Sequence, residues 1–479
     1  MDYTVYTIVF MLKGEIALVK DLTRGSPTKL IIMFALSMLA SSMMSYVYST
    51  TDSLMVSWYI DPDALGAISA ASPASGLIEG FACATVGGFS ILAGRIFGAG
   101  DLQRLRNMMA NVVYLSAAFV GLATLICTVF CRQFVLLMNT PAGFVDMATS
   151  YLFILMVAMP IAGVCWVCGS MFRALGDSKT PLMISAICGL SNVVFNALFL
   201  GLIRTGIEGA AYGTVCANAL GAVLYLIFLK KRMNILLFGK EDAYISVPTM
   251  KILLSNGIPL GLLNSVITVG AMILQIAVNG HGEVVVNGIA IGGRVITIFW
   301  MFFQTFESSI IYFCAQNLGA GRIDRVRRGV KNTLLINLGI GAVCLVVALL
   351  FGKYIYMMFV GDSPEIIAVA EQYVFTQIVF FPLMVTLCVW RGGLKGLGST
   401  VPAVLCGGIE LISRMVVSFC FADNLTVLYF AGPLAWIGAS IFLAILYPRT
   451  LRRREREFAS IKQKQEAAEQ VEKENSVTV

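Results

Sequence analysis

Charged residues and histidine are scarce in this chain of 479 residues. Asp, Glu, Lys and Arg together make up only 13% of it, and His281 is its single histidine. Soluble domains usually carry about a quarter charged residues. The low charge therefore excludes an ordinary set of water-soluble domains, and the lone histidine counts against a histidine-rich metal site.

Motifs for nucleotide and metal chemistry are missing as well. The chain has no GxxxxGK[ST] segment, so we expect no direct use of ATP. Cys165 and Cys168 have the spacing of half a zinc or redox site, but no second pair accompanies them. All twelve cysteines lie within or beside apolar stretches, where cysteine behaves as a small apolar residue. We expect no metal centre, no disulfide framework and no cofactor.

Apolar residues, in contrast, make up 58% of the chain. A membrane-spanning helix needs about 20 of them, so the sequence predicts an all-α polytopic membrane protein with little chain left for soluble domains. The expected spans lie near 28–57, 64–93, 107–131, 146–171, 180–203, 207–229, 252–279, 286–315, 332–351, 366–390, 400–421 and 425–447. Residues 1–20 lack the basic region and cleavage site of a signal peptide, so we expect an interfacial helix there. The charged tail beyond Tyr447 is expected to be helical at best near its start.

The basic residues are distributed unevenly over the predicted loops. With both termini on one side, that side receives 29 of the 34 Lys and Arg residues. The opposite side holds Arg132, Arg204 and Lys353, while Arg294 and Arg414 fall inside spans. Because basic residues collect in cytoplasmic loops, we expect a multi-pass protein of the inner (plasma) membrane with both termini in the cytoplasm.

One sequence pattern occurs twice, about 222 residues apart. Gly98–Arg106 recurs as Gly319–Arg327, and Arg173–Pro181 recurs with one deletion as Lys395–Pro402. Tyr151 and Pro160 recur as Tyr373 and Pro382. Because each half holds an even number of spans, the pattern predicts two parallel six-helix repeats around a central cleft, the architecture of an alternating-access carrier. The expected parts are an N-terminal segment 1–24, an N-lobe 25–229, a linker 230–251, a C-lobe 252–447 and a tail 448–479.

Residues 25–447 resemble the multidrug and toxic compound extrusion (MATE) transporters. The resemblance rests on Phe172–Pro181, its counterpart Lys395–Pro402 and the paired Gly-Ala-Gly connections. It implies a V-shaped, two-lobed carrier, not an enzyme, that exports small organic compounds, often cationic or amphipathic, in exchange for Na⁺ or H⁺. We expect a monomer in the lipid bilayer without a nucleic-acid partner. Relatives with similar helices move lipid-linked saccharides, so a flippase remains the alternative; a membrane-embedded transferase would need clustered acids or histidines, and a channel would need a selectivity element.

Ionisable groups inside spans are candidate functional residues because inserting one costs roughly 2.5–3.5 kcal/mol. They are Asp52, Glu79, Arg294, Glu307, Glu410 and Arg414. Asp52 stands out because it follows the polar run Ser49–Thr51. The resemblance adds Tyr48, Asn192, Asn196 and Thr214 as partners of Asp52 in a cation-coupling site that could hold Na⁺. It also implies two departures: Asn196 stands where relatives commonly have a second aspartate, and Ser37 where they have a helix-bending proline, which the second half retains as Pro259.

Each candidate also has a simpler structural interpretation. Asp52 could be a helix-end residue, and Glu79 could merely face a water-filled cleft. Glu410 and Arg414 are four residues apart and could neutralise one another for structural reasons. Arg294 and Glu307 are too far apart for a local pair, so each needs a partner on another helix or water. The aromatic run Phe299–Phe303 is expected to serve packing or face lipid.

Overall fold

The computed structural model describes residues 21–60, 62–137 and 140–477, and the helix expected within residues 1–20 lies outside them. Among the described residues, ten helices are long and apolar enough to cross a membrane, and two bent helix pairs bring the number of possible spans to twelve. The helices of the first half are α2 (Pro27–Tyr59), α3 (Pro62–Gly98), α4 (Leu102–Val129), α5 (Cys131–Leu137), α6 (Val145–Val157), α7 (Met159–Ala174), α8 (Lys179–Asn196) and α9 (Glu208–Arg232). The second half contains α10 (Val247–Asn279), α11 (Glu283–Gly319), α12 (Ile323–Val360), α13 (Pro364–Val379), α14 (Phe381–Gly396), α15 (Val401–Cys420), α16 (Leu425–Tyr429) and α17 (Ala431–Val477). The all-α polytopic fold is confirmed.

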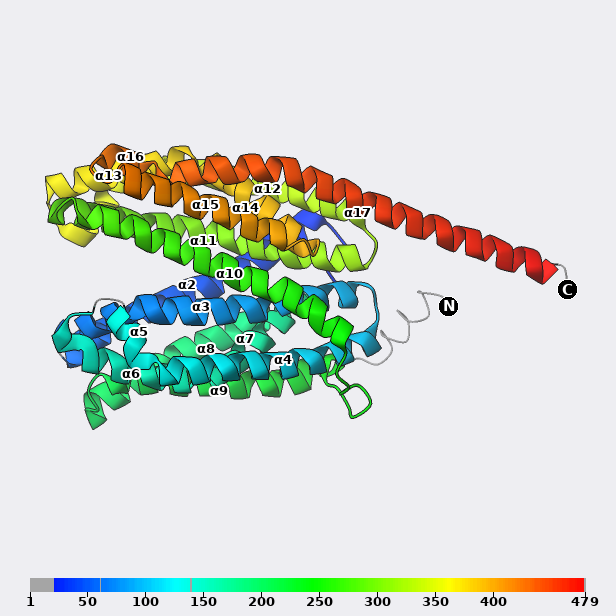
Figure 1. Cartoon of the computed structure of the whole chain (residues 1–479), viewed down its shortest axis with the longest axis horizontal. Coiled ribbons are helices and arrows are strands. Elements are labelled where there is room, and N and C mark those ends of the chain that lie inside the picture. Colours follow the sequence, from blue (N-terminus) through cyan, green and yellow to red (C-terminus); the bar gives the residue numbers. More distant parts are fainter. Residues whose placement is uncertain (1–20, 61, 138–139, 478–479) are drawn as a thin grey trace.

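The helices form two bundles that lie side by side, α2–α9 in one and α10–α17 in the other (Figure 1). We call them the N-lobe and the C-lobe. Corresponding helices pack in the same way in both: α8 lies against α9 as α15 lies against α17, and α3 lies against α4 as α11 lies against α12. The internal repeat in the sequence is therefore an internal repeat of the structure.

The repeated prolines bend the same span in each lobe. Pro160 lies in the first turn of α7, which meets α6 at 49°. Pro382 lies in the first turn of α14, which meets α13 at 52°. Proline has no N–H to donate and excludes the carbonyl one turn earlier, so each helix breaks just before it.

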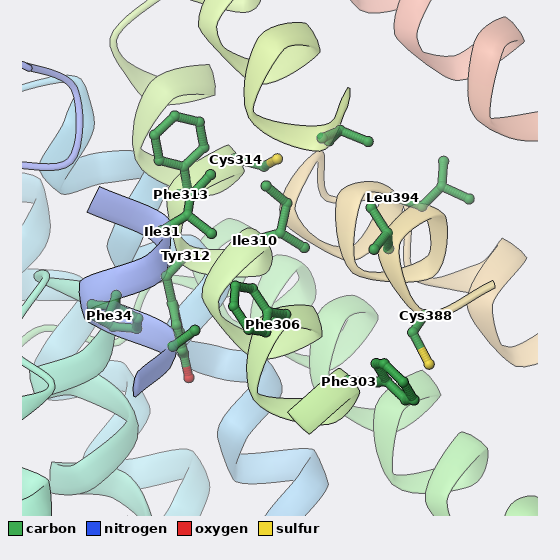
Figure 2. Close-up of a cluster of buried hydrophobic side chains, with 14 of the residues drawn as sticks. Ile31, Phe34, Phe303, Phe306, Ile310, Tyr312, Phe313, Cys314, Cys388 and Leu394 are labelled. Atoms are coloured by element: carbon green, nitrogen blue, oxygen red, sulfur yellow. The ribbon is translucent and has the colours of Figure 1, made fainter. Parts of the chain in front are cut away.

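The two lobes meet mainly through four helices. The first half of α2 packs on α11, and α3 packs on α10. Figure 2 shows Ile31 and Phe34 of α2 beside Tyr312 of α11. The Ser309 hydroxyl donates to the Ile31 carbonyl at 3.1 Å, and the rings of Phe34 and Tyr312 meet edge-on at 6.0 Å.

Close backbone contacts hold the lobes together near the turns that end α3 and α11. A Cβ on Gly98 would clash with the Gln316 backbone, and one on Gly319 would clash with the Arg95 carbonyl. The Gln316 side chain accepts from Leu22 N–H at 3.0 Å and donates to the Ala174 carbonyl at 2.7 Å. The hydrogen bonds that Ser90, Ser309 and Gln316 form between the lobes lie toward this end, which we call the closed end.

The charged tail differs from the prediction. α17 continues as one helix to Val477 and projects beyond the bundle (Figure 1), whereas the sequence predicted helix only near its start. The tail is rich in Arg, Lys, Glu, Gln and Ala, which favour helix. Glu457 also pairs with Arg453 and Arg454 at 2.9 and 2.8 Å, one turn away on the same helix. The last predicted span, 425–447, is divided into α16 and the start of α17.

Candidate functional site

Three helices of the N-lobe bring the predicted cation-site residues together. Asp52 lies on α2, Asn192 and Asn196 lie one turn apart on α8, and Thr214 lies on α9. The Asn196 amide donates to the Asp52 carboxylate and, at 3.3 Å, to the Asn192 side-chain oxygen. The Asn192 amide donates to the Thr214 hydroxyl at 3.4 Å. These four residues, which we call the N-lobe site, form one hydrogen-bonded chain.

Small residues allow this close approach of α2, α8 and α9. The ring of Tyr48, one turn before Asp52, packs on Gly189, where a Cβ would lie 3.3 Å from it. A Cβ on Gly213 would clash with the Asn196 side-chain oxygen. That oxygen is fully buried and, within the part of the chain described, has no hydrogen-bond partner. A buried amide oxygen without a donor is costly, so the N-lobe site holds one unused oxygen ligand.

The N-lobe acids have no basic partner. Asp52 and Glu79 form no ion pair with any described residue. Asp52 is half-buried and two turns from the end of α2, so it is not a terminal helix residue. Glu79 is half-buried on α3 and has neither an ion pair nor a hydrogen bond in the described ranges. Neither carboxylate therefore has a base in contact with it.

The donor atoms of the N-lobe site suit a monovalent hard cation or a proton. A carboxylate, amide oxygens and a hydroxyl are all oxygen ligands. No cluster of three or more His, Cys, Asp or Glu side chains occurs among the described residues, so the donor set does not match a resident transition metal.

The C-lobe buries a different arrangement, a closed network of five charges. Arg391 on α14 binds both oxygens of Glu307 at 3.0 Å and donates to Glu410 at 3.2 Å. Lys395 binds Glu307 at 2.7 Å, and Arg414 approaches Glu410 at 3.9 Å. The Arg391 side chain is 4% exposed. Such buried charges require nearly complete pairing, and here each acid contacts two bases.

Arg391, one residue beyond the predicted span 366–390, is a member of the buried network that the spans did not indicate. Helix α14 continues to Gly396 and carries it into the core. The predicted pair of Glu410 and Arg414 exists, but the shorter bond of Glu410 is to Arg391. The available signal was the i, i+4 spacing of Arg391 and Lys395, together with two acids in spans that lacked basic partners.

The remaining candidates lie apart from both groups. Arg294 is exposed on α11 and stacks on Phe359 of α12, with 5.6 Å from guanidinium carbon to ring centre. Phe299 and Phe303 are buried against Phe381 at 6.3 and 5.4 Å, so these members of the aromatic run serve packing.

The N-lobe site lies away from the closed end. Asp52 is in the second half of α2, whereas the part of α2 that bonds to the C-lobe is its first turns, around Ile31. Asn196 ends α8, and Thr214 lies in the second turn of α9. The four side chains therefore lie toward the ends of α2, α8 and α9 that are opposite the closed end.

Comparison with known proteins places both lobes in one family. The MatE family model matches residues 37–198 and 259–420. The chain is 26% identical over 426 residues to the probable multidrug resistance protein YpnP of Bacillus subtilis, covering 87% of this chain and 91% of that protein. It is 20% identical over 440 residues to the multidrug export protein MepA of Staphylococcus aureus, covering 88% and 94%. A relative from Shewanella oneidensis, 24% identical over 301 residues and covering 61% and 64%, is named an FAD transporter.

Solved structures share the fold. A MOP superfamily transporter from Pyrococcus furiosus superposes with a TM-score of 0.81 at 19% identity, covering 92% of this chain and 98% of that one. An outward-facing multidrug resistance transporter of the MATE family gives the same TM-score at 18% identity, with the same coverage. The likeness extends over both lobes.

Proposed function

This chain belongs to the MatE family of multidrug and toxic compound extrusion transporters, and on that premise we propose that it exports small organic compounds by alternating access, in exchange for Na⁺ or H⁺. The proposal rests on the N-lobe site, in which the Asp52 carboxylate has no basic partner. Residues of α2, α8 and α9 form this site, in a lobe that matches the family model. The curated relatives named for multidrug export support the substrate class. The carboxylates of Asp52 and Glu79, which have no base in contact with them, favour a cationic substrate.

Asp52 and Asn196 form the proposed coupling element. With Asp52 charged, the Asn196 amide donates to it and the buried amide oxygen is left without a donor. When a proton or Na⁺ neutralises Asp52, rotation of this amide would turn its oxygen toward the carboxylic acid or the ion. Loading would thus give the buried amide oxygen a partner, in exchange for the hydrogen bond that the amide donates to Asn192. An ion drives transport only if it binds one conformation better than the other, and a rearranged contact between α2 and α8 supplies such a difference.

The closed end is proposed to face the cytoplasm. The excess of basic residues lies on that side, as at Arg104, Arg106 and Arg322. The described lobes would then be closed to the cytoplasm and open to the outside, the state in which substrate leaves. In a chain whose native cysteines are replaced, a membrane-impermeant thiol reagent should label Arg328→Cys only after cell lysis; labelling in intact cells would reverse the orientation.

Reconstitution tests the function directly. Purified protein in proteoliposomes is loaded with a fluorescent organic cation, and Na⁺ and H⁺ gradients are imposed separately. Export that follows one gradient and stops when that gradient is collapsed is the expected result. Translocation of a lipid-linked saccharide without cation export would instead establish the flippase alternative.

A further inference from the structure

A pocket of about 260 Å³ opens on the outer surface of the C-lobe, between α12, α14 and α17. Its charged lining consists of Arg327 and Lys331 of α12 and Arg452 of α17. Its apolar lining includes Trp390 of α14 and Tyr447 of α17. The pocket lies at the closed end, where α12 begins and α17 leaves the bundle (Figure 1). It is remote from the N-lobe site.

The pocket has more positive charge than its neighbours neutralise. Arg327 is paired only loosely with Glu455, at 3.8 Å. Lys331 and Arg452 are exposed, and neither forms an ion pair or a hydrogen bond with any residue that the structure describes. Three basic side chains thus converge with one distant carboxylate, which makes the pocket attractive to an anion.

The other wall of the pocket is apolar and continues toward the membrane. Trp390 and Tyr447 stack face to face, 6.1 Å apart and 8° from parallel. Leu335 on α12, together with Ile441 and Ile445 on α17, extends the apolar surface, and each of the three is about half exposed or more. Ile441 and Ile445 lie two helical turns before Pro448 and Arg452, on the same face of α17. The basic lining of the pocket and this apolar strip therefore lie on one continuous surface.

In the N-lobe, the position that corresponds to this pocket is occupied by the segment that follows α9. After α9 the chain turns back, and the short helix Asn234–Leu236 packs against both α4 and α9, with Leu236 buried. Asn107 of α4 donates to the carbonyls of Asp242 and Tyr244 at 2.9 Å. In the C-lobe, α17 runs straight on and no described segment covers the groove. In the repeat, Lys331 corresponds to Ala110, so its charge has no counterpart in the N-lobe.

We propose that this pocket binds an anionic phospholipid of the cytoplasmic leaflet. Lys331 and Arg452 bind the phosphate, with Arg327 at the edge of the site. One acyl chain lies along Leu334 and then along Leu335, Ile441 and Ile445. Basic pockets between transmembrane helices at the cytoplasmic interface are suited to acidic lipid headgroups. The stacked Trp390 and Tyr447 line the same pocket as the basic side chains, and such aromatic side chains favour the boundary between headgroup and acyl chain. A soluble phosphate would use the charges but not the apolar strip.

The test measures lipid binding to the full-length protein purified in detergent. Phosphatidylglycerol and phosphatidylcholine are titrated separately, and bound lipid is counted by native mass spectrometry. The variant is Lys331→Gln/Arg452→Gln. The matched control is Arg328→Gln/Arg449→Gln, which removes two exposed charges that form no ion pair with a described residue, each three residues away on the same helix but outside the pocket lining. Glycerol 3-phosphate is added as a competitor without acyl chains.

We expect the protein to bind phosphatidylglycerol selectively. The affinity should fall roughly thirtyfold in the pocket variant and less than about threefold in the control. Glycerol 3-phosphate should not displace the lipid. A second variant, Leu334→Trp, fills the pocket without changing its charge and should also weaken binding. Loss of binding in both variants would show that the loss does not come from misfolding of the first variant. Equal loss in the control would show diffuse attraction and overturn the site. Displacement by glycerol 3-phosphate, or equal binding of phosphatidylcholine, would overturn the lipid assignment.

Discussion

The two lobes share a fold but have opposite polar interiors. In the N-lobe, Asp52 has amide and hydroxyl neighbours and no base. In the C-lobe, Glu307 and Glu410 are enclosed by three bases, and Arg391 joins them. The acids have no repeat-related counterparts, since the residue that corresponds to Asp52 is Leu274 and the one that corresponds to Glu410 is Gly189, whereas Lys395 corresponds to the basic Arg173.

This difference separates two uses of a buried charge. In the C-lobe network every charged group contacts one of opposite sign, so removing one group would leave a buried charge with fewer partners or none. The N-lobe site has a carboxylate without a basic partner and an amide oxygen without a donor, and these are the two oxygen ligands that the proposed coupling ion would use. We therefore expect charge changes in the N-lobe to affect coupling and charge changes in the C-lobe to affect folding.

The largest expected effect is on transport. Asp52→Asn removes the only acid of the N-lobe site while keeping its size, so gradient-driven export should be lost while expression and thermal unfolding stay near those of the wild type. Export from proteoliposomes under imposed gradients measures transport. The midpoint of thermal unfolding in detergent measures stability. Full gradient-driven export by a well-folded Asp52→Asn protein would exclude Asp52 as the coupling group.

Removing the centre of the C-lobe network should act on stability. Arg391→Leu leaves Glu410 with one base at 3.9 Å and Glu307 with Lys395 alone, so we expect a loss of about 3–5 kcal/mol in unfolding free energy. The matched comparison is Glu410→Leu/Arg414→Leu, which removes an acid and a base together and keeps Arg391 bound to Glu307. This pair should lose clearly less stability in denaturant titrations. Equal losses would mean that the network does not act through Arg391.

The contact between the lobes can be altered without touching either polar group. In Gly319→Ala the new methyl group would clash with the Arg95 carbonyl. Such overpacking costs about 1–3 kcal/mol of stability. The cost falls only on the state closed at this end, so the population should shift 5- to 150-fold toward the opposite state. Distances between spin labels at Arg106→Cys and Arg328→Cys, in a chain whose native cysteines are replaced, would measure the shift. Gly293→Ala, on the same helix with no atom nearby, is the control and should leave the distances unchanged.

The sequence predicts the spans and the repeat because both depend on local information. Apolar length sets each span, and Pro160 and Pro382 mark the same bend twice. It does not predict which charges meet: Arg391 binds residues on α11 and α15 that are distant in the chain, and it lies one residue beyond a predicted span. The partners of Asp52 were identified through the family resemblance, because residues on α8 and α9 have no local link to α2.

The smallest expected effect comes from making the N-lobe site more acidic. Asn196→Asp places a second carboxylate in contact with Asp52, whereas in the C-lobe network both acids contact a base. Two touching carboxylates do not both stay ionised without a bound proton or cation, so cation affinity should rise on the order of tenfold, equivalent to about 1.4 kcal/mol. Binding of radioactive Na⁺ in detergent at several pH values measures this, because a proton that fills the pair will suppress Na⁺ binding more strongly as pH falls. Asn192→Asp is the control, since Asn192 contacts Asn196 and Thr214 but not Asp52 and adds the same charge one turn away. A rise confined to Asn196→Asp places the ion between α2 and α8. Equal rises in both variants would mean that net charge alone governs affinity, and the contrast between an open N-lobe site and a closed C-lobe network would then no longer rest on Asp52.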